Sequence, residues 1–123
     1  QEQCRDLVTA VDQLAAAGEK DVLIVGDFNE LNSHESLKPL VDAGFTSQMK
    51  FLTADSAKGS YVKNSQLESS TDLIDQVWIR FDETQEVVRR SAQVMKLESR
   101  EAAKRYIIEQ SDHVPVWVSF RID

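Results

Sequence analysis

The sequence predicts one domain of the α+β class, in which a mostly antiparallel sheet carries helices on one face. Two segments space their apolar residues as amphipathic helices do, and several short runs are rich in β-branched and aromatic residues. Hairpin-like pairs of these runs lie toward the C-terminus. The length of 123 residues suits one domain with a modest core, and a hydrophobic content of 41% excludes a disordered chain.

The first half predicts two helices around a strand. A helix over residues 3–17 ends at Gly18 and carries an apolar stripe made of Cys4, Leu7, Val8, Val11, Leu14 and Ala15. Residues 21–26 follow as a strand, and its apolar run 22–25 predicts burial on both faces. A polar loop over residues 27–33 leads to a second helix, which Ser36 is expected to cap and Gly44 to end.

The second half predicts mainly strands. Short strands are expected within 45–52 and 60–63, with a loop at 53–59 between them and a polar loop at 64–70. Residues 73–80 form a strong strand candidate, with 86–95 as its partner after a turn at 81–85. Ser99 is expected to cap a helix through Ile107, and residues 114–122 alternate apolar and polar side chains as a strand does.

The charge and cysteine content restrict the function classes. A net charge of −7 argues against a stand-alone nucleic-acid binder, although a bound cation would still allow chemistry on phosphates. Cys4 is the single cysteine, so an intrachain disulfide is excluded and a reducing, cytoplasmic compartment is favoured. The sequence contains no apolar run of transmembrane length and no signal-peptide pattern.

Three polar clusters adjoin predicted strands and suggest hydrolytic chemistry. Asp27 and Asn29 follow the first strand, Asp75 lies inside an apolar strand, and Asp112 and His113 precede the last strand. A histidine base needs a carboxylate to orient it, which Asp75 would supply. The oxygen ligands of Asp27, Asn29 and Asp112 suit Mg²⁺ or Mn²⁺. The alternatives are an Asx turn at Asp27 and a structural role for His113.

These motifs resemble those of the endonuclease/exonuclease/phosphatase superfamily. The matching segments are Gly-Asp-Phe-Asn at 26–29, Ile-Asp-Gln-Val at 74–77 and Ser-Asp-His-Val-Pro-Val at 111–116, in the same order as in that family. The resemblance implies one half of a four-layer α/β sandwich. It also implies a metal-dependent phosphoesterase that hydrolyses a phosphate ester, either in nucleic acid or in a small phosphorylated molecule.

The resemblance also implies a role for each matching residue. His113 matches the general base, and Asp75 matches the aspartate that orients it. Asp27 matches the aspartate that positions water or assists the leaving group, Asn29 matches an asparagine that contacts the phosphate, and Asp112 matches a metal-site aspartate. His34 matches no catalytic residue and is expected at the exposed start of a helix. The bases of the helix after Ser99 are expected to form a solvated face.

The resemblance covers only the C-terminal half of the family's domain. The family's N-terminal half brings a metal-binding glutamate, an asparagine and a second histidine, and no candidate for them precedes Asp27. We therefore expect residues 1–123 to be incomplete and inactive alone, with either the missing half or a second copy covering the inner sheet face. The alternative function is a non-catalytic binding or assembly domain that retains the fold.

Overall fold

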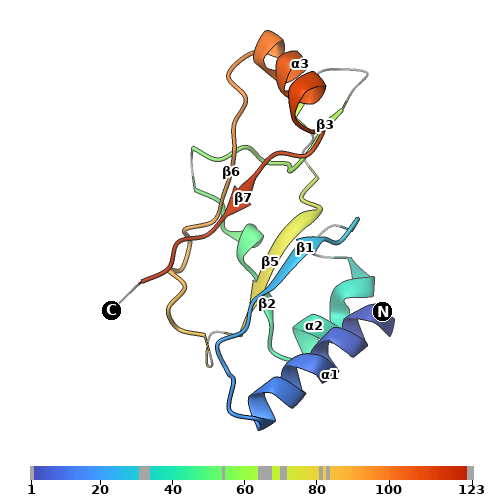
Figure 1. Cartoon of the computed structure of the whole chain (residues 1–123), viewed down its shortest axis with the longest axis vertical. Helices are drawn as coiled ribbons and strands as arrows, with labels where there is room; N and C mark the ends of the chain where they lie inside the picture. The colour runs from blue at the N-terminus through green and yellow to red at the C-terminus, as the bar shows by residue number, and fades with distance from the viewer. Residues whose placement is uncertain are drawn as a thin grey trace.

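The protein is a small mixed α/β structure with antiparallel strand pairs, and three α-helices lie in the part that the computed structural model describes (Figure 1). The described residues are 2–30, 34–53, 55–63, 68–69, 72–80, 82 and 84–121. In chain order the elements are α1 (Glu2–Ala16), β1 (Ile24–Asp27), η1 (Glu35–Leu37), α2 (Lys38–Asp42), β2 (Thr46–Ser47), η2 (Gln48–Lys50), β3 (Val62–Lys63), β4 (Glu68–Ser69), β5 (Asp75–Ile79), β6 (Gln93–Val94), α3 (Arg100–Glu109) and β7 (Val116–Trp117).

The strand β5 is the centre of the fold. It lies between β1 and β2 in a three-stranded antiparallel sheet. The register with β1 places Asp27 directly opposite Asp75. Two like charges at opposed positions destabilise a sheet unless a third group compensates them. A cation or a hydrogen-bond donor near Asp27 and Asp75 would therefore stabilise this end of the sheet.

The two faces of β5 belong to different hydrophobic clusters. Trp78 packs with α1, α2 and Ile24 of β1, whereas Val77 packs with residues of η2, β6 and α3. The expectation that the helices share one face is therefore wrong for α3, because Ala103 is buried in the second cluster. In Figure 1, α1 and α2 lie together at one end of the molecule and α3 lies at the other.

The first strand is not buried on both faces as its apolar run predicts. Ile24 is buried, but Val25 is 64% exposed. The cause is the position of β1 at the edge of the sheet. Val25 lies opposite Val77 of β5, but the hydrophobic cluster that covers Val77 does not extend to Val25. The apolar stripe of α1 is also covered only in part, since Leu7 is 38% and Leu14 is 46% exposed.

The second helical segment begins two residues earlier than expected. His34, rather than Ser36, is the N-cap of η1, and its ring accepts a hydrogen bond from the Ser36 backbone N–H. The helix then continues as α2 with Pro39 in its first turn, where the missing N–H has no intrahelical partner to lose. His34 thus occupies the exposed helix start that the sequence indicates.

Residues 86–95 do not form the predicted partner strand of β5. Only β6 is regular there, and it pairs with β7 instead. Arg90 has a φ of 59°, a left-handed conformation that interrupts an extended strand. The regular part of the predicted strand 114–122 is limited to β7. Phe120 is 45% exposed, and the predicted Ile122 lies outside the described residues.

The remaining expectations concern the third helix and the middle loops. Ser99 caps α3 by accepting the Ala102 N–H at 3.0 Å, as predicted, and the helix continues to Glu109. The short strand expected at 60–63 is present as β3, paired with β4. Most of the polar loop predicted at 64–70 lies outside the described residues.

Candidate active site

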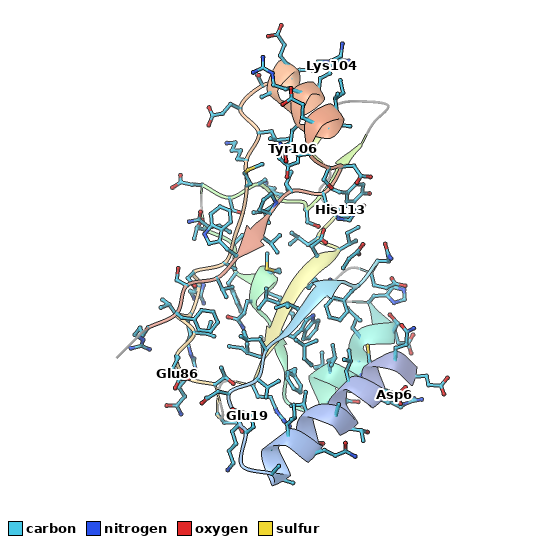
Figure 2. The ribbon with its side chains drawn as sticks, viewed as in Figure 1. Asp6, Glu19, Glu86, Lys104, Tyr106 and His113 are labelled. Carbon is cyan, nitrogen blue, oxygen red and sulfur yellow. The ribbon has the colours of Figure 1, made fainter. Side chains whose placement is uncertain are left out.

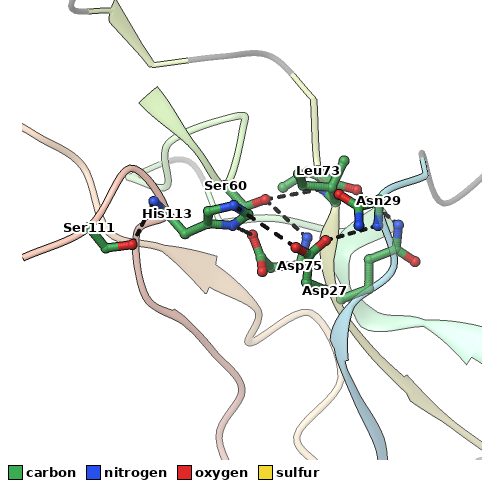
Figure 3. Close-up of polar contacts among 9 residues, drawn as sticks. Asp27, Asn29, Ser60, Leu73, Asp75, Ser111 and His113 are labelled. Carbon is green, nitrogen blue, oxygen red and sulfur yellow. Dashed lines mark hydrogen bonds and ion pairs between the residues drawn. The ribbon is translucent and has the colours of Figure 1, made fainter. Parts of the chain in front are cut away.

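Three strand ends bring Asp27, Asp75 and His113 together (Figure 3). Asp27 ends β1 and Asp75 begins β5, so the antiparallel register makes them neighbours. His113 precedes β7 and forms an isolated antiparallel bridge with Tyr61. The site is therefore assembled by pairing between segments that are far apart in the sequence.

The expected contact between Asp75 and His113 is present. The Nδ1 atom of His113 lies 2.7 Å from Oδ2 of Asp75. On the other side of the ring, Nε2 lies 4.0 Å from Oδ2 of Asp27. The Asp75 side chain is 19% exposed, compared with 34% for His113 and 40% for Asp27. Asp75 is thus the most sheltered of the three side chains, and the Nε2 side of the ring faces the more exposed carboxylate, that of Asp27.

The acidic surroundings raise the pKa of His113 above its ordinary value of 6.5. The largest cause is the hydrogen bond to Asp75, which stabilises the imidazolium. Burial opposes this effect, while the charges of Asp75, Asp27 and Asp112 add to it. The ring is therefore held as a stronger base than a free histidine.

Asp27 also forms the Asx turn that the alternative interpretation predicts. Its Oδ1 accepts the Asn29 N–H at 2.9 Å, and Asn29 has a φ of 53°. Because a left-handed residue does not continue a strand, β1 ends at Asp27 and Asn29 belongs to the turn. The turn and the site are compatible, because Asp27 uses Oδ1 for the turn and presents Oδ2 to His113.

Asp112 is exposed and lies outside the group formed by Asp27, Asp75 and His113. Its contribution in this structure is electrostatic, since its charge raises the pKa of His113. Ser111 fixes the turn at this point, because its Oγ accepts the His113 N–H at 3.0 Å. The metal role that the resemblance implies for Asp112 remains a prediction.

Ser60 is a site residue that the sequence pattern did not indicate. It is fully buried, and its Oγ lies 3.1 Å from the backbone N of Ile74 and 3.0 Å from that of Asp75. Its backbone carbonyl accepts the Val114 N–H at 2.9 Å. Ser60 therefore links the chain beside Asp75 to the chain beside His113. A serine at the start of a short predicted strand gives no sign of these contacts, and only the strand pairing reveals this role.

Tyr61 forms one wall of the site. Its ring centroid lies 6.1 Å from that of His113, and its hydroxyl donates to Asp72 at 3.2 Å. Asp72 thus anchors a side chain next to the site. An aromatic ring beside the imidazole limits the directions from which water reaches it.

The donors of the site suit a divalent cation. Asp27, Asp75 and His113 each offer one ligand atom, and these atoms lie within 4.8 Å of one another. Carboxylate oxygens match Mg²⁺ or Mn²⁺, and an imidazole nitrogen is acceptable to Mn²⁺ and heavier metals. Two opposed carboxylates close to one histidine leave a net negative charge, which favours cation binding.

Other candidate residues lie away from this site. Figure 2 shows Lys104 pointing outward from α3, on the side of the helix away from His113. Arg100, Lys104 and Arg105 are exposed, as expected for a solvated face.

Cys4 is a buried free thiol within the cluster around α1. None of the helices in the described ranges is long and apolar enough to cross a bilayer.

Comparisons with known proteins identify no relative. A scan against protein-family models, a search of curated proteins and a search of solved structures each found no match to this chain. The geometry of the residues described above is therefore the basis for any functional conclusion.

Proposed function

We propose that this chain supplies the base half of a metal-dependent phosphoesterase that hydrolyses phosphodiester or phosphomonoester bonds. The observation that carries the proposal is the position of the His113 ring between two carboxylates. Nδ1 lies 2.7 Å from Asp75, and Nε2 lies 4.0 Å from Asp27. The three sequence motifs that resemble the endonuclease/exonuclease/phosphatase superfamily meet at this point.

The proposal includes a proton path. When His113 is neutral, Nδ1–H donates to Asp75, so the lone pair of Nε2 is free to accept a proton. A water between Nε2 and Asp27 would give up that proton as its oxygen attacks phosphorus. Asp75 then stabilises the imidazolium, and Asp27 orients the water. A bound Mg²⁺ or Mn²⁺ supplies neutralisation of the charge that develops on the phosphate.

The proposal includes a requirement for further groups. Nδ1 of His113 is engaged by Asp75 and Nε2 accepts the proton, so only carboxylate oxygens of this group remain as ligands for a cation among the described residues. Mg²⁺ prefers six oxygen ligands and dehydrates reluctantly. We propose that an additional segment or a second copy completes both the coordination and the four-layer sandwich, and that the 123-residue chain alone has negligible activity.

The test compares two forms of the protein. The 123-residue chain and the product of its complete reading frame are assayed with bis(p-nitrophenyl) phosphate and p-nitrophenyl phosphate in Mg²⁺ and in Mn²⁺. We expect hydrolysis by the complete product, loss of hydrolysis in chelator and little hydrolysis by the shorter chain. Absence of metal-dependent hydrolysis of either ester by the folded complete product would contradict the proposal.

Exposed apolar side chains favour a second candidate function, a binding or assembly domain. Val25 is 64%, Trp117 is 43% and Phe120 is 45% exposed. Exposed apolar side chains that gather into one patch are commonly covered by a partner. Sedimentation velocity of the purified chain combined with the hydrolysis assay distinguishes the two, since a non-catalytic assembly domain would self-associate while hydrolysis by the complete product stays undetectable.

A further inference from the structure

A buried amide lies directly behind the site. Gln76 follows Asp75 in β5 and is only 1% exposed. A buried amide that lacks hydrogen-bond partners is costly, so its contacts indicate what its position requires. The Nε2 atom of Gln76 donates to the backbone carbonyls of Glu30 at 2.6 Å and Leu73 at 2.9 Å, and Oε1 accepts the Trp78 indole N–H at 2.7 Å.

These three contacts fix the orientation of the amide. An indole N–H is only a donor and a backbone carbonyl is only an acceptor. Rotation of the Gln76 amide by half a turn would place its NH₂ against the Trp78 N–H and its oxygen against both carbonyls. The buried Trp78 therefore holds the amide with its two N–H groups directed at the carbonyls of Glu30 and Leu73.

The contact with Glu30 controls the turn that follows β1. Among the described residues, three hydrogen bonds hold the backbone of this turn: Phe28 N–H to the Ile74 carbonyl at 2.7 Å, Asn29 N–H to Asp27 Oδ1 at 2.9 Å, and the Gln76 amide to the Glu30 carbonyl at 2.6 Å. The first two hold the beginning of the turn, and at its far end the Glu30 carboxylate also lies 3.4 Å from Nδ1 of His34. The side chain of Gln76 in β5 binds the backbone carbonyl of Glu30 at that end of the turn, although the two residues are 46 positions apart in the sequence.

We propose that Gln76 is a positioning residue that acts through Asp27. By holding Glu30, Gln76 keeps the Asn29 N–H on Asp27 Oδ1, and Oδ2 then remains directed at His113 Nε2. Release of the turn frees the Asp27 carboxylate to rotate away from the site. The positional part of this inference stands on the contacts alone, and its catalytic consequence rests on the proposed phosphoesterase function.

The structural test uses Gln76→Met, which keeps a similar volume and removes both N–H donors. The readout is the amide signal of Asn29 in ¹H–¹⁵N spectra of the 123-residue chain. We expect that signal to move toward its position in Asp27→Ala, where no carboxylate receives the N–H. Ile79→Val, a buried apolar change on the same strand, is the control and should leave the Asn29 signal in place. An unmoved Asn29 signal in folded Gln76→Met would overturn the proposal.

The catalytic test is a double-mutant cycle in the complete product. Gln76→Met should lower kcat/KM by about 10- to 100-fold, as loss of an orienting partner does. The double variant with Asp27→Ala should be no slower than Asp27→Ala alone, because both changes remove one function. Fully additive losses would overturn the proposal. If Gln76→Met does not fold, Gln76→Asn shortens the reach by one methylene and gives the same two comparisons.

The two tests separate this inference from the proposed function. If the complete product hydrolyses no phosphate ester, the proposed function fails, but the Asn29 signal still decides whether Gln76 positions Asp27. If hydrolysis occurs and the Asn29 signal does not respond, the proposed function stands and the role of Gln76 is refuted.

Discussion

The two histidines of this chain occupy regions that use the imidazole in opposite ways. His34 lies at the start of η1, is 50% exposed at its side chain, and uses Nδ1 to accept the Ser36 N–H at 3.1 Å. His113 lies between strands, is 34% exposed, and directs Nδ1 at a carboxylate 2.7 Å away. The first ring caps a helix through a nitrogen lone pair. In the proposed mechanism, the contact with Asp75 sets the tautomer of the second ring, and Nε2 is left as a base.

The comparison shows that the environment, and not the residue type, decides the chemistry. Glu30 lies 3.4 Å from His34 Nδ1, but the cap needs that nitrogen unprotonated, so the carboxylate and the cap compete. At His113 the carboxylate and the hydrogen bond act together, and the pKa of the ring is raised. Each histidine is thus the natural control for the other.

The largest expected difference is in activity. In the complete product, His113→Ala should lower hydrolysis by about 10²- to 10⁴-fold, the usual contribution of a general base, whereas His34→Ala should leave it nearly unchanged. Steady-state rates with bis(p-nitrophenyl) phosphate measure both variants. Equal effects of the two substitutions, with folding verified by circular dichroism, would remove the distinction drawn between them.

The next largest effect concerns the pH dependence of the rate. His113 must be unprotonated to accept a proton, so kcat/KM should rise with pH through the raised pKa of this ring. Asp75→Asn removes the largest cause of that raised pKa, so the midpoint of the profile should move to lower pH while the plateau falls. A midpoint that stays in place would show that Asp75 does not govern the base.

A smaller effect is expected on stability. Because the pKa of His113 is higher in the folded than in the unfolded chain, the protonated His113–Asp75 pair stabilises the fold fully below pH 6.5. That stabilisation is lost as the pH rises through the folded value. Solvent screening of a ring that is one-third exposed keeps the effect modest. Urea unfolding at pH 5.5 and 8.5 should show a smaller pH difference for Asp75→Asn than for the unaltered chain.

The smallest effect belongs to the helix cap. His34→Ala removes the acceptor of the Ser36 N–H and should lower the free energy of unfolding by about 0.5–1 kcal/mol, the lower part of the range for N-caps. His34→Asn, which offers another side-chain acceptor, should recover most of this loss. Urea unfolding at pH 7 measures both variants, and no loss in His34→Ala would show that the cap contributes little.

The sequence was sufficient where the signal is local or belongs to a motif. The periodicity of residues 3–17 predicted α1, Ser99 predicted the start of α3, and the motifs around Asp75 and His113 predicted their contact. The mixed α/β class with antiparallel strands followed from the same patterns. The helices depend on residues that are close in sequence. The contact between Asp75 and His113 depends on the chemistry of these two side chains, because a histidine base needs a carboxylate partner.

The sequence was insufficient where neighbours in space decide the outcome. The apolar run that includes Val25 is equally compatible with an edge strand and a central strand. The residue types in 86–95 favour a strand, but they do not indicate whether it pairs with β5 or with β7. The roles of Ser60 and Gln76 arise from backbone groups that other segments bring near them. No pattern in the chain encodes those positions.

The central claim is that Asp75 fixes His113 with Nδ1 protonated and Nε2 free. Long-range ¹H–¹⁵N correlation spectra of the imidazole rings, recorded across a pH titration of the 123-residue chain, test this directly. We expect neutral His113 to carry its proton on Nδ1, with a pKa above 6.5 that decreases in Asp75→Asn, and neutral His34 to carry its proton on Nε2. A neutral His113 protonated on Nε2, or a pKa unchanged by Asp75→Asn, would contradict the account.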